Sequence, residues 1–574
     1  MIRRLPATFL ACLLTALTGV GPALVSAQPG PALCGKRALP RPKLVVGIVV
    51  DQMRYDFLYR YWAKYPAKGG FKRLLTQGFQ YTDCHYDYVP TYTGPGHAAV
   101  YTGTGPSGNG IVGNNWFVRE TGKGVYVTED PAVQTVGSAS AAGQMSPKYL
   151  LTSTITDELR LADIESKVVG VCLKDRGSIL PAGHFPTGAY WYDGLTGGFI
   201  SSTWYMEELP AWATAFNARH RADSLLSRPW TPLLPLAAYT ESTSDDVAWE
   251  NTFPGETAPT FPHNLPAIRA MGLPKVPMAS QPPASYDLLR QTPFGNTLTV
   301  EFAAAAIFGE NLGRGLATDF LALSFSSTDY VGHFYGPNAV ETQDTYLRLD
   351  RDLGALLDLL ENEIGKDQTL VFLTADHGAA HAAGFLAQRR VPAGSIGPVL
   401  MRDSLQHELA RRHGAGNWVQ AYDNQQIYLN HNLIRSCNLR LSDVEEEVVG
   451  FMTQFAGVSR AIAAVDLQKS HWESGLLMYL ENGFYPKRSG DVLVVLEPGW
   501  LEGYAGPLVK GTTHGTASNY DTHVPLVFWG GLIKRGESAA PVRVVDIAPT
   551  LAQWLRIQEP NGCTGRVLRE VLRK

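Results

Sequence analysis

Three short apolar runs in the sequence lead directly to acidic and histidine side chains. The runs cover residues 44–50, 320–325 and 369–373. The side chains that follow them are Asp51, Asp329, His333, Asp376 and His377. A carboxylate at the end of a buried strand costs free energy unless it is hydrogen-bonded, paired or bound to a metal. The repeated pattern therefore indicates a functional use for these groups.

These side chains have the chemistry of metal ligands. Asp and His suit zinc and some other divalent ions, and a catalytic site needs about three protein ligands per ion. With His514 from the stretch 511–516, the sequence offers two such sets. Alone, Asp51 is typical of a loop-capping aspartate and each histidine of a satisfied core or surface residue. Together they favour a site for two ions.

A candidate nucleophile lies in the segment Val-Pro-Thr-Tyr-Thr-Gly-Pro-Gly-His at 89–97. A threonine hydroxyl such as that of Thr93 is a weak nucleophile at neutral pH, and coordination to a cation stabilises its alkoxide. Standing alone, the segment is more typical of an ordinary Thr/Pro/Gly turn. We interpret His97 as a residue that orients this turn. His85, His184, His381 and His523 are interpreted as structural.

The elements that must position these residues are predicted from apolar runs. Buried strands are expected at 44–50, 168–173, 320–325, 369–373, 492–496 and 524–529. Leucines spaced by three and four between 346 and 360 predict an amphipathic helix. This alternation predicts an α/β fold, with a mostly parallel central sheet sandwiched by helices. Stretches at about 185–300 and 395–488 are expected to be insertions that cap one end of the sheet.

Composition narrows the possible functions. The 574 residues are 45% hydrophobic, enough for a large core, and carry 49 basic against 53 acidic side chains. This near balance of charge lacks the excess of basic side chains that is typical of nucleic-acid-binding proteins, and it fits a small polar substrate better. A monomer is taken as the default state.

The N-terminus predicts export. Arg3 and Arg4 precede an apolar run at 9–17, and small residues at 25–27 suit a signal peptidase, so 1–27 is predicted to be a signal peptide. The run is too short for a stable membrane anchor. A leader at 28–42 then precedes a catalytic domain at 43–574, in a periplasmic or secreted protein. The remaining cysteines lack any Cys-x-x-Cys spacing, so no cysteine metal site is expected.

Five motifs together resemble the alkaline phosphatase superfamily. They are Val-Asp-Gln-Met-Arg at 50–54, Thr-x-Pro-x-His at 93–97, Gly-Ile-Val-Gly-Asn-Asn-Trp at 110–116, Thr-Ala-Asp-His-Gly at 374–378 and His-Gly at 514–515. Within the superfamily the sequence is most similar to PafA-type bacterial phosphatases, including the PhoK branch. The motifs fall in order over nearly all of 43–574.

The resemblance implies a role for each matching position. Thr93 would be the phosphorylated nucleophile, and Asn114 the amide that contacts a phosphoryl oxygen, with Asn115 a packing residue. One zinc ion would be held by Asp51, Asp376, His377 and the Thr93 oxygen. The second zinc ion would be held by Asp329, His333 and His514.

Lys174 and Arg176 distinguish the subclass. In the PafA-like branch a Lys and an Arg separated by one residue contact the phosphoryl oxygens, and extended backbone would point both side chains to one side. Two cations there favour phosphate monoesters, which carry more anionic oxygens than diesters. Without the other motifs, a Lys-x-Arg sequence is usually only a pair of solvent-exposed charged side chains.

The sequence thus predicts an exported alkaline phosphatase that hydrolyses small phosphate monoesters through a phosphothreonine, with two zinc ions. The alternative is a phosphodiesterase of the nucleotide pyrophosphatase type, which shares the metals and the nucleophile. A sulfatase is disfavoured because no Cys-x-Pro-x-Arg segment is present. A non-catalytic binding protein on the same fold is also disfavoured, because such proteins usually lack some of the ligands.

Overall fold

A computed structural model describes residues 41–273, 284–503 and 509–572. The predicted signal peptide and Cys34 lie outside the described residues, as does all but the end of the leader. In the described part of the chain no helix combines the length and apolar character needed to cross a membrane. The four cysteines there, Cys84, Cys172, Cys437 and Cys563, are free.

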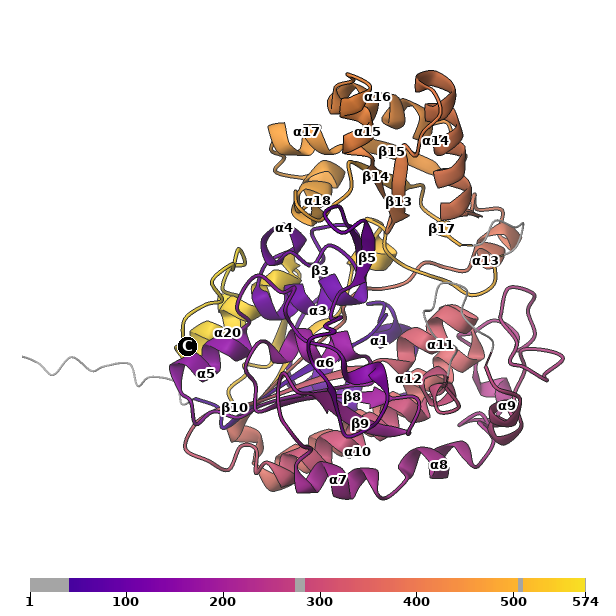
Figure 1. Cartoon of the computed structure of the whole chain (residues 1–574). Helices are drawn as coiled ribbons and strands as arrows, with labels where there is room; N and C mark the ends of the chain where they lie inside the picture. Colours follow the sequence, from indigo (N-terminus) through magenta and orange to yellow (C-terminus); the bar gives the residue numbers. More distant parts are fainter. Residues whose placement is uncertain (1–40, 274–283, 504–508, 573–574) are drawn as a thin grey trace, which may run out of the picture. The chain divides into compact units, whose positions relative to one another are not determined.

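A ten-stranded sheet forms the centre of the fold (Figure 1). Its order is β19-β2-β18-β11-β1-β10-β7-β8-β9-β6. The bounds are Gly536–Ser538, Phe79–Tyr81, Leu526–Gly530, Thr369–Thr374, Leu44–Val50, Asp319–Phe325, Val168–Cys172, Gly188–Asp193, Gly198–Ser202 and Thr135–Val136, in that order. The five strands from β11 to β8 are parallel, while β18, β2, β9 and β6 join by antiparallel pairing. The predicted α/β class with a mostly parallel sheet is confirmed.

Two groups of helices cover the sheet (Figure 1). One group packs around α6 and α3, and the other around α10 and α12. The first contains α3 (Thr93–Thr102), α5 (Ile155–Ala162), α6 (Asp175–Ala182) and α20 (Ile547–Leu555). The second contains α2 (Gly70–Gln77), α10 (Phe294–Gly309), α11 (Ser327–Tyr335) and α12 (Val340–Glu363). The leucine pattern predicted at 346–360 lies in α12, where its apolar face is buried.

The first predicted insertion does more than cap the sheet. Strands β8 and β9 belong to it and extend the central sheet beyond β7. It also supplies α7 (Ala211–Asn217), α8 (Arg221–Leu226) and α9 (Leu265–Met271). Tyr190 and Trp191 in β8 are buried, which is consistent with a strand covered on both faces.

The second insertion contains its own sheet and core. The four strands of this sheet have the order β13-β14-β16-β15, with bounds Val419–Asp423, Gln426–Leu429, Val492–Leu496 and Val458–Ala463, so β16 joins it from just beyond the predicted end of the insertion. The apolar run at 492–496 is therefore a strand, as predicted, but not a strand of the central sheet. Its helices are α14 (Pro398–His413), α15 (His431–Ser436), α16 (Leu441–Met452), α17 (Ala464–Lys469) and α18 (Gly475–Gly483).

Short elements complete the fold. Three two-stranded pairs are β3 (Cys84–His85) with β20 (Val542–Arg543), β4 (Asn115–Val118) with β5 (Lys123–Tyr126), and β12 (Gly394–Ile396) with β17 (Trp500–Glu502). The remaining α-helices are α1 (Phe57–Arg60), α4 (Pro106–Asn109), α13 (Ala383–Gln388) and α19 (Asn519–Thr522).

A buried acidic cluster joins the first insertion to α12. His263 lies 3.0 Å from Glu256 and 3.3 Å from Glu341. Glu250 is fully buried, and neither of its carboxylate oxygens has a hydrogen-bond partner. Burial and the charge of Glu341 raise the pKa of Glu250. Burial lowers the pKa of His263, but its bonds to Glu256 and Glu341 outweigh this and raise it to about 9.

Candidate metal centre and nucleophile

Three neighbouring parallel strands deliver the carboxylates to one edge of the sheet. In β1, Val50 is paired with Phe325 of β10 and Val49 with Thr374 of β11, so the three chains leave the sheet together. Asp51 follows β1 directly, and its N–H donates to the carbonyl of Phe325 at 3.0 Å. The carboxyl ends of parallel strands are where open α/β folds place their ligands.

One buried ligand group contains Asp51, Asp376 and His377. One donor atom from each lies within 4.8 Å of the other two. The His377 Nε2 atom is 3.6 Å from the Asp51 Oδ1 and 3.6 Å from the Asp376 Oδ2, and both oxygens are buried without a hydrogen-bond partner. Burial raises the pKa of Asp51 and of Asp376, and their mutual proximity adds to the rise for Asp376. Two orphaned carboxylate oxygens aimed at one imidazole fit a divalent cation.

A second group surrounds Asp329, near the start of α11. One donor atom from each of Asp329, His377 and His514 lies within 4.8 Å of the other two. The Asp329 Oδ1 is 3.1 Å from the Nε2 of His333, one turn further along α11, and 3.7 Å from the Nε2 of His514. The structure thus brings all six predicted ligands together, with His377 within reach of both groups. The assignment of each ligand to one ion stays a prediction.

The three histidines are oriented as metal ligands usually are. Each turns its Nδ1 toward a backbone carbonyl: His333 toward Thr512 at 2.7 Å, His377 toward Gly378 at 2.9 Å, and His514 toward Thr91 at 2.7 Å. In a neutral ring this fixes the tautomer in which Nε2 carries the lone pair, and the Nε2 of His333 faces the Asp329 carboxylate; burial lowers the pKa of His333, but the charge of Asp329 outweighs it and raises that pKa. Burial lowers the pKa of His377 to about 3 and that of His514 well below its usual value, so both rings are neutral.

Lys174 contacts the carboxylates rather than an open phosphate position. Its Nζ is buried, 2.6 Å from the Oδ2 of Asp51 and 2.6 Å from the Oδ2 of Asp329. Burial lowers the pKa of Lys174, but the charges of Asp329 and Asp51 outweigh it and raise that pKa. The lysine therefore provides a permanent positive charge between the two ligand groups.

Arg176 lies in the first turn of α6, where a tyrosine fixes it. Its Nη1 donates to the hydroxyl of Tyr126 at 2.8 Å, and that hydroxyl donates to Asp175 at 3.0 Å. The Arg176 Nε is buried without a partner. Tyr126 comes from β5, and the sequence analysis missed it because nothing in its local pattern marks it.

Thr93 is the first residue of α3, so its hydroxyl lies at the positive end of a helix dipole. Its Oγ1 is 3.5 Å from the Nε2 of His377. The Gly94 N–H donates to the Oδ1 of Asn114 at 2.8 Å, which turns the amide NH2 of Asn114 away from Gly94. An NH2 group is the donor that a phosphoryl oxygen requires.

His97 holds the turn as the sequence analysis interpreted it. It is fully buried, with Nδ1 2.9 Å from the Thr93 carbonyl and Nε2 2.8 Å from the Ser324 hydroxyl. One turn of α3 is thereby anchored to β10. Burial lowers the pKa of His97 to about 4, so the ring is neutral.

Gln52 is a site residue that the sequence analysis missed. Its backbone N–H donates to the Oδ1 of Asp376 at 3.1 Å, and its Nε2 donates to the Oδ1 of Asp329 at 2.8 Å. Its φ of 62° lies in the left-handed region, which a residue with a side chain adopts at a cost of about 1–3 kcal/mol. The only signal was its place directly after Asp51. It links the two ligand groups.

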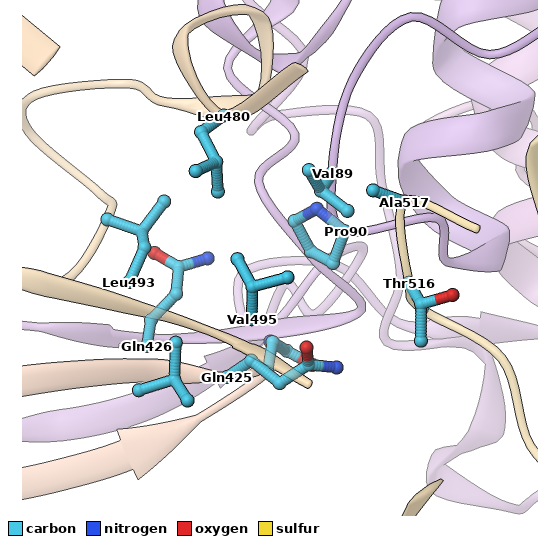
Figure 2. Close-up of a pocket in the computed structure, with 12 residues that line it drawn as sticks. Val89, Pro90, Gln425, Gln426, Leu480, Leu493, Val495, Thr516 and Ala517 are labelled. Atoms are coloured by element: carbon cyan, nitrogen blue, oxygen red, sulfur yellow. The ribbon is translucent and has the colours of Figure 1, made fainter. Parts of the chain in front are cut away.

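The second insertion reaches this site through the tip of its β13–β14 hairpin. The Asn424 side chain donates to the carbonyl of Asn115, next to Asn114. A small pocket of about 20 Å³ lies beside it, and Figure 2 shows Gln425 of the hairpin on one side of this pocket, with Pro90 and Thr516 on the other. Pro90 belongs to the nucleophile segment 89–97, so the hairpin of the insertion lies close to that segment.

Comparison with known proteins identifies the family. A family model described as type I phosphodiesterase / nucleotide pyrophosphatase matches residues 45–518. The chain belongs to this family. The family lies within the alkaline phosphatase superfamily, so the resemblance seen in the sequence is confirmed.

Members of the family match over almost the whole chain. Alkaline phosphatase PafA of Elizabethkingia meningoseptica is 45% identical over 537 residues, which are 93% of this chain and 95% of PafA. A protein named calcium-transporting ATPase from Myroides odoratus is 43% identical over 544 residues, 94% of this chain and 96% of that protein. The crystal structure of PafA matches with a TM-score of 0.88 and 44% identity, covering 93% of this chain and 100% of PafA. The predicted PafA-type resemblance is confirmed as well.

Proposed function

We propose that this protein is a metal-dependent alkaline phosphatase that hydrolyses phosphate monoesters through a phosphothreonine at Thr93. The observation that carries the proposal is the meeting of one threonine hydroxyl, at a helix N-terminus, with two buried Asp/His groups that share His377. The similarity to PafA over 93% of the chain supports the same activity.

The donor set fits two divalent ions of the zinc type. The site offers carboxylates with orphaned oxygens and neutral imidazoles with free Nε2 atoms, which suit zinc. Asp51, Asp376 and His377 would hold one ion, and Asp329, His333 and His514 the other. Such ions, when bound, lower the pKa of the threonine hydroxyl and stabilise the charge that develops on the leaving oxygen.

The residues of the chain then perform an in-line displacement. The Thr93 Oγ1 attacks phosphorus, the Oγ1–P bond forms and the bond to the alcohol oxygen breaks, so the hydroxyl gives up its proton and the departing alcohol takes one up. Water attacks the phosphothreonine in the reverse direction, releases inorganic phosphate and returns the proton to Thr93. His97 and the Asn114–Gly94 bond hold the hydroxyl in place through both steps.

Three donors serve the non-bridging oxygens. We assign this role to the NH2 of Asn114, the ammonium of Lys174 and the guanidinium of Arg176. The ammonium lies 2.6 Å from both Asp51 and Asp329, so ions held by those carboxylates would compete with it and leave it available to the phosphoryl oxygens. Two positive charges beside three anionic oxygens favour a monoester over a diester.

The family description names phosphodiesterases, so the subclass needs its own test. Wild-type protein is assayed on p-nitrophenyl phosphate, its bis-ester and ATP, the last because one relative is named an ATPase. Monoester turnover far above diester turnover is expected. Removing Lys174 or Arg176 should lower monoester turnover by roughly 10-fold to 150-fold, the equivalent of one charge-assisted bond of about 1.5–3 kcal/mol. Equal or better diester turnover would overturn the subclass.

The nucleophile is tested on Thr93→Ala with metal content measured in parallel. Retained metal with abolished turnover supports the role of Thr93, and full activity in this variant contradicts it. Mass spectrometry of wild-type protein quenched in acid with substrate should detect a phosphoryl group on Thr93. We further propose that the protein is exported, on the strength of the signal-peptide pattern at 1–27.

A further inference from the structure

Outside the catalytic centre, a second kind of ligand cluster lies where β3 meets the segment after α19. Asp83, His85 and His523 each place one donor atom within 4.8 Å of the other two. All three side chains are partly exposed, so solvent ions can reach them. The sequence analysis interpreted both histidines as structural, because they match no ligand position of the catalytic site.

The backbone brings the two histidines together. His85 and His523 are paired in an isolated antiparallel bridge. The flanking bonds run from the Val524 N–H to the Cys84 carbonyl and from the Tyr86 N–H to the Thr522 carbonyl, at 3.0 Å each. This is the pattern of a non-hydrogen-bonded pair, in which facing side chains approach most closely. The two rings accordingly stack with centroids 4.6 Å apart.

Asp83 adds the third donor from the bend directly before β3, two residues before His85. Its Oδ1 is 2.8 Å from the His85 Nε2. Donor atoms around a tetrahedral zinc ion at about 2.0 Å lie roughly 3.3 Å apart, so only a small opening of this contact would admit an ion.

Neighbouring groups fix the rings in place. The His523 Nε2 bonds to the Thr82 carbonyl at 2.9 Å, and the His85 Nδ1 lies 3.3 Å from the Thr522 hydroxyl. Tyr55 stacks on the other side of His523, with centroids 4.2 Å apart. Hydrogen bonds that orient an imidazole are typical of metal sites.

We propose that Asp83, His85 and His523 form a third divalent-metal site, separate from the catalytic pair. Two imidazoles and one carboxylate select borderline transition-metal ions such as Zn²⁺ or Cu²⁺ over Mg²⁺ or Ca²⁺. Three protein ligands leave positions open for water.

The site is connected to the catalytic centre through residues 520–523. The Asp521 side chain accepts from the N–H and the hydroxyl of Thr516, at 2.8 and 2.7 Å, in the loop of His514. The Asp521 carbonyl accepts from the N–H of Gly378 at 2.8 Å, next to His377. An ion on His523 would restrain the segment that positions two catalytic ligands.

The test uses the protein with its catalytic metals in place and Cu²⁺ as the probe. Titration followed by electron paramagnetic resonance should show one additional copper per chain with hyperfine splitting from two nitrogens. His85→Gln and His523→Gln should weaken this binding at least 10-fold. His471→Gln is the matched control, because His471 is another surface imidazole 2.8 Å from a carboxylate, that of Glu481, and should leave binding unchanged.

The variants are chosen to keep the fold. Glutamine at 523 retains an N–H donor for the Thr82 carbonyl, and catalytic metal content reports on folding. Should either histidine variant fail to fold, Asp83→Asn serves, since the Asp83 side chain is 41% exposed. The proposal is overturned when wild type takes up no copper beyond its catalytic ions, or when these variants bind the additional copper as tightly as wild type does.

Discussion

The close packing of α3 against the end of β11 makes Gly96 a sensitive position. A Cβ atom at Gly96 would lie 2.3 Å from the carbonyl oxygen of Asp376 and 2.8 Å from its Cβ. Ordinary van der Waals contact begins at about 3.4 Å, so the two segments would have to separate by about 1.1 Å. Since α3 begins with Thr93 and Asp376 is a predicted ligand, Gly96→Ala should move the hydroxyl away from the metal centre.

The size of the effect follows from two opposing terms. Overpacking lowers the unfolding free energy by about 1–3 kcal/mol, whereas replacing a helical glycine by alanine raises it by about 1 kcal/mol. Gly96→Ala should therefore lower the unfolding free energy by roughly 0–2 kcal/mol. A displacement of about 1 Å at a reacting group lowers the rate about 100-fold, so activity should suffer more than stability.

The assay compares kcat/KM for p-nitrophenyl phosphate with the denaturant midpoint in the same preparation. Gly450→Ala is the control, because Gly450 lies in α16 with open space where a Cβ would stand. The unfolding free energy of that variant should rise by up to about 1 kcal/mol, and its activity should equal that of wild type. Wild-type kcat/KM in Gly96→Ala would refute the reasoning.

Three further predictions concern metal, pH and the second insertion. Chelation should lower the melting temperature by several degrees in calorimetry, because it leaves the buried Oδ1 of Asp51 and the buried Oδ2 of Asp376 without a partner; an unchanged melting temperature would contradict this. The raised pKa values of Glu250 and His263 mean that the native state binds more protons than the unfolded state, so stability should fall as pH rises from about 5 through 9. Glu250→Gln should flatten that fall in denaturant titrations at pH 5, 7 and 9, and an identical slope would refute the assignment. Asn424→Ala, which removes the bond to the Asn115 carbonyl, should lower kcat/KM about 10-fold with little change in stability, whereas equal losses in both would indicate a purely structural role.

Much of the fold was predictable from local pattern. Residues 44–50 and 369–373 are continuous β-branched and apolar runs, and such runs require burial on both faces, which a parallel sheet provides. Because neighbouring parallel strands end at the same edge, Asp51, Asp329 and Asp376 were expected to meet, and the structure brings them together. The run at 492–496 shows the limit, because apolar content predicts a strand without saying which sheet it joins.

The sequence by itself determined which residue types were available: carboxylates after buried strands, three candidate ligand histidines, and one threonine in a Pro/Gly-rich segment. Only the tertiary structure decided their partners. It placed Lys174 between Asp51 and Asp329, put Gln52 in a left-handed conformation, and set His85 opposite His523. The physical reason is that periodicity reports whether a side chain is buried, whereas contacts between residues hundreds of positions apart depend on strand order and register, which no local pattern encodes.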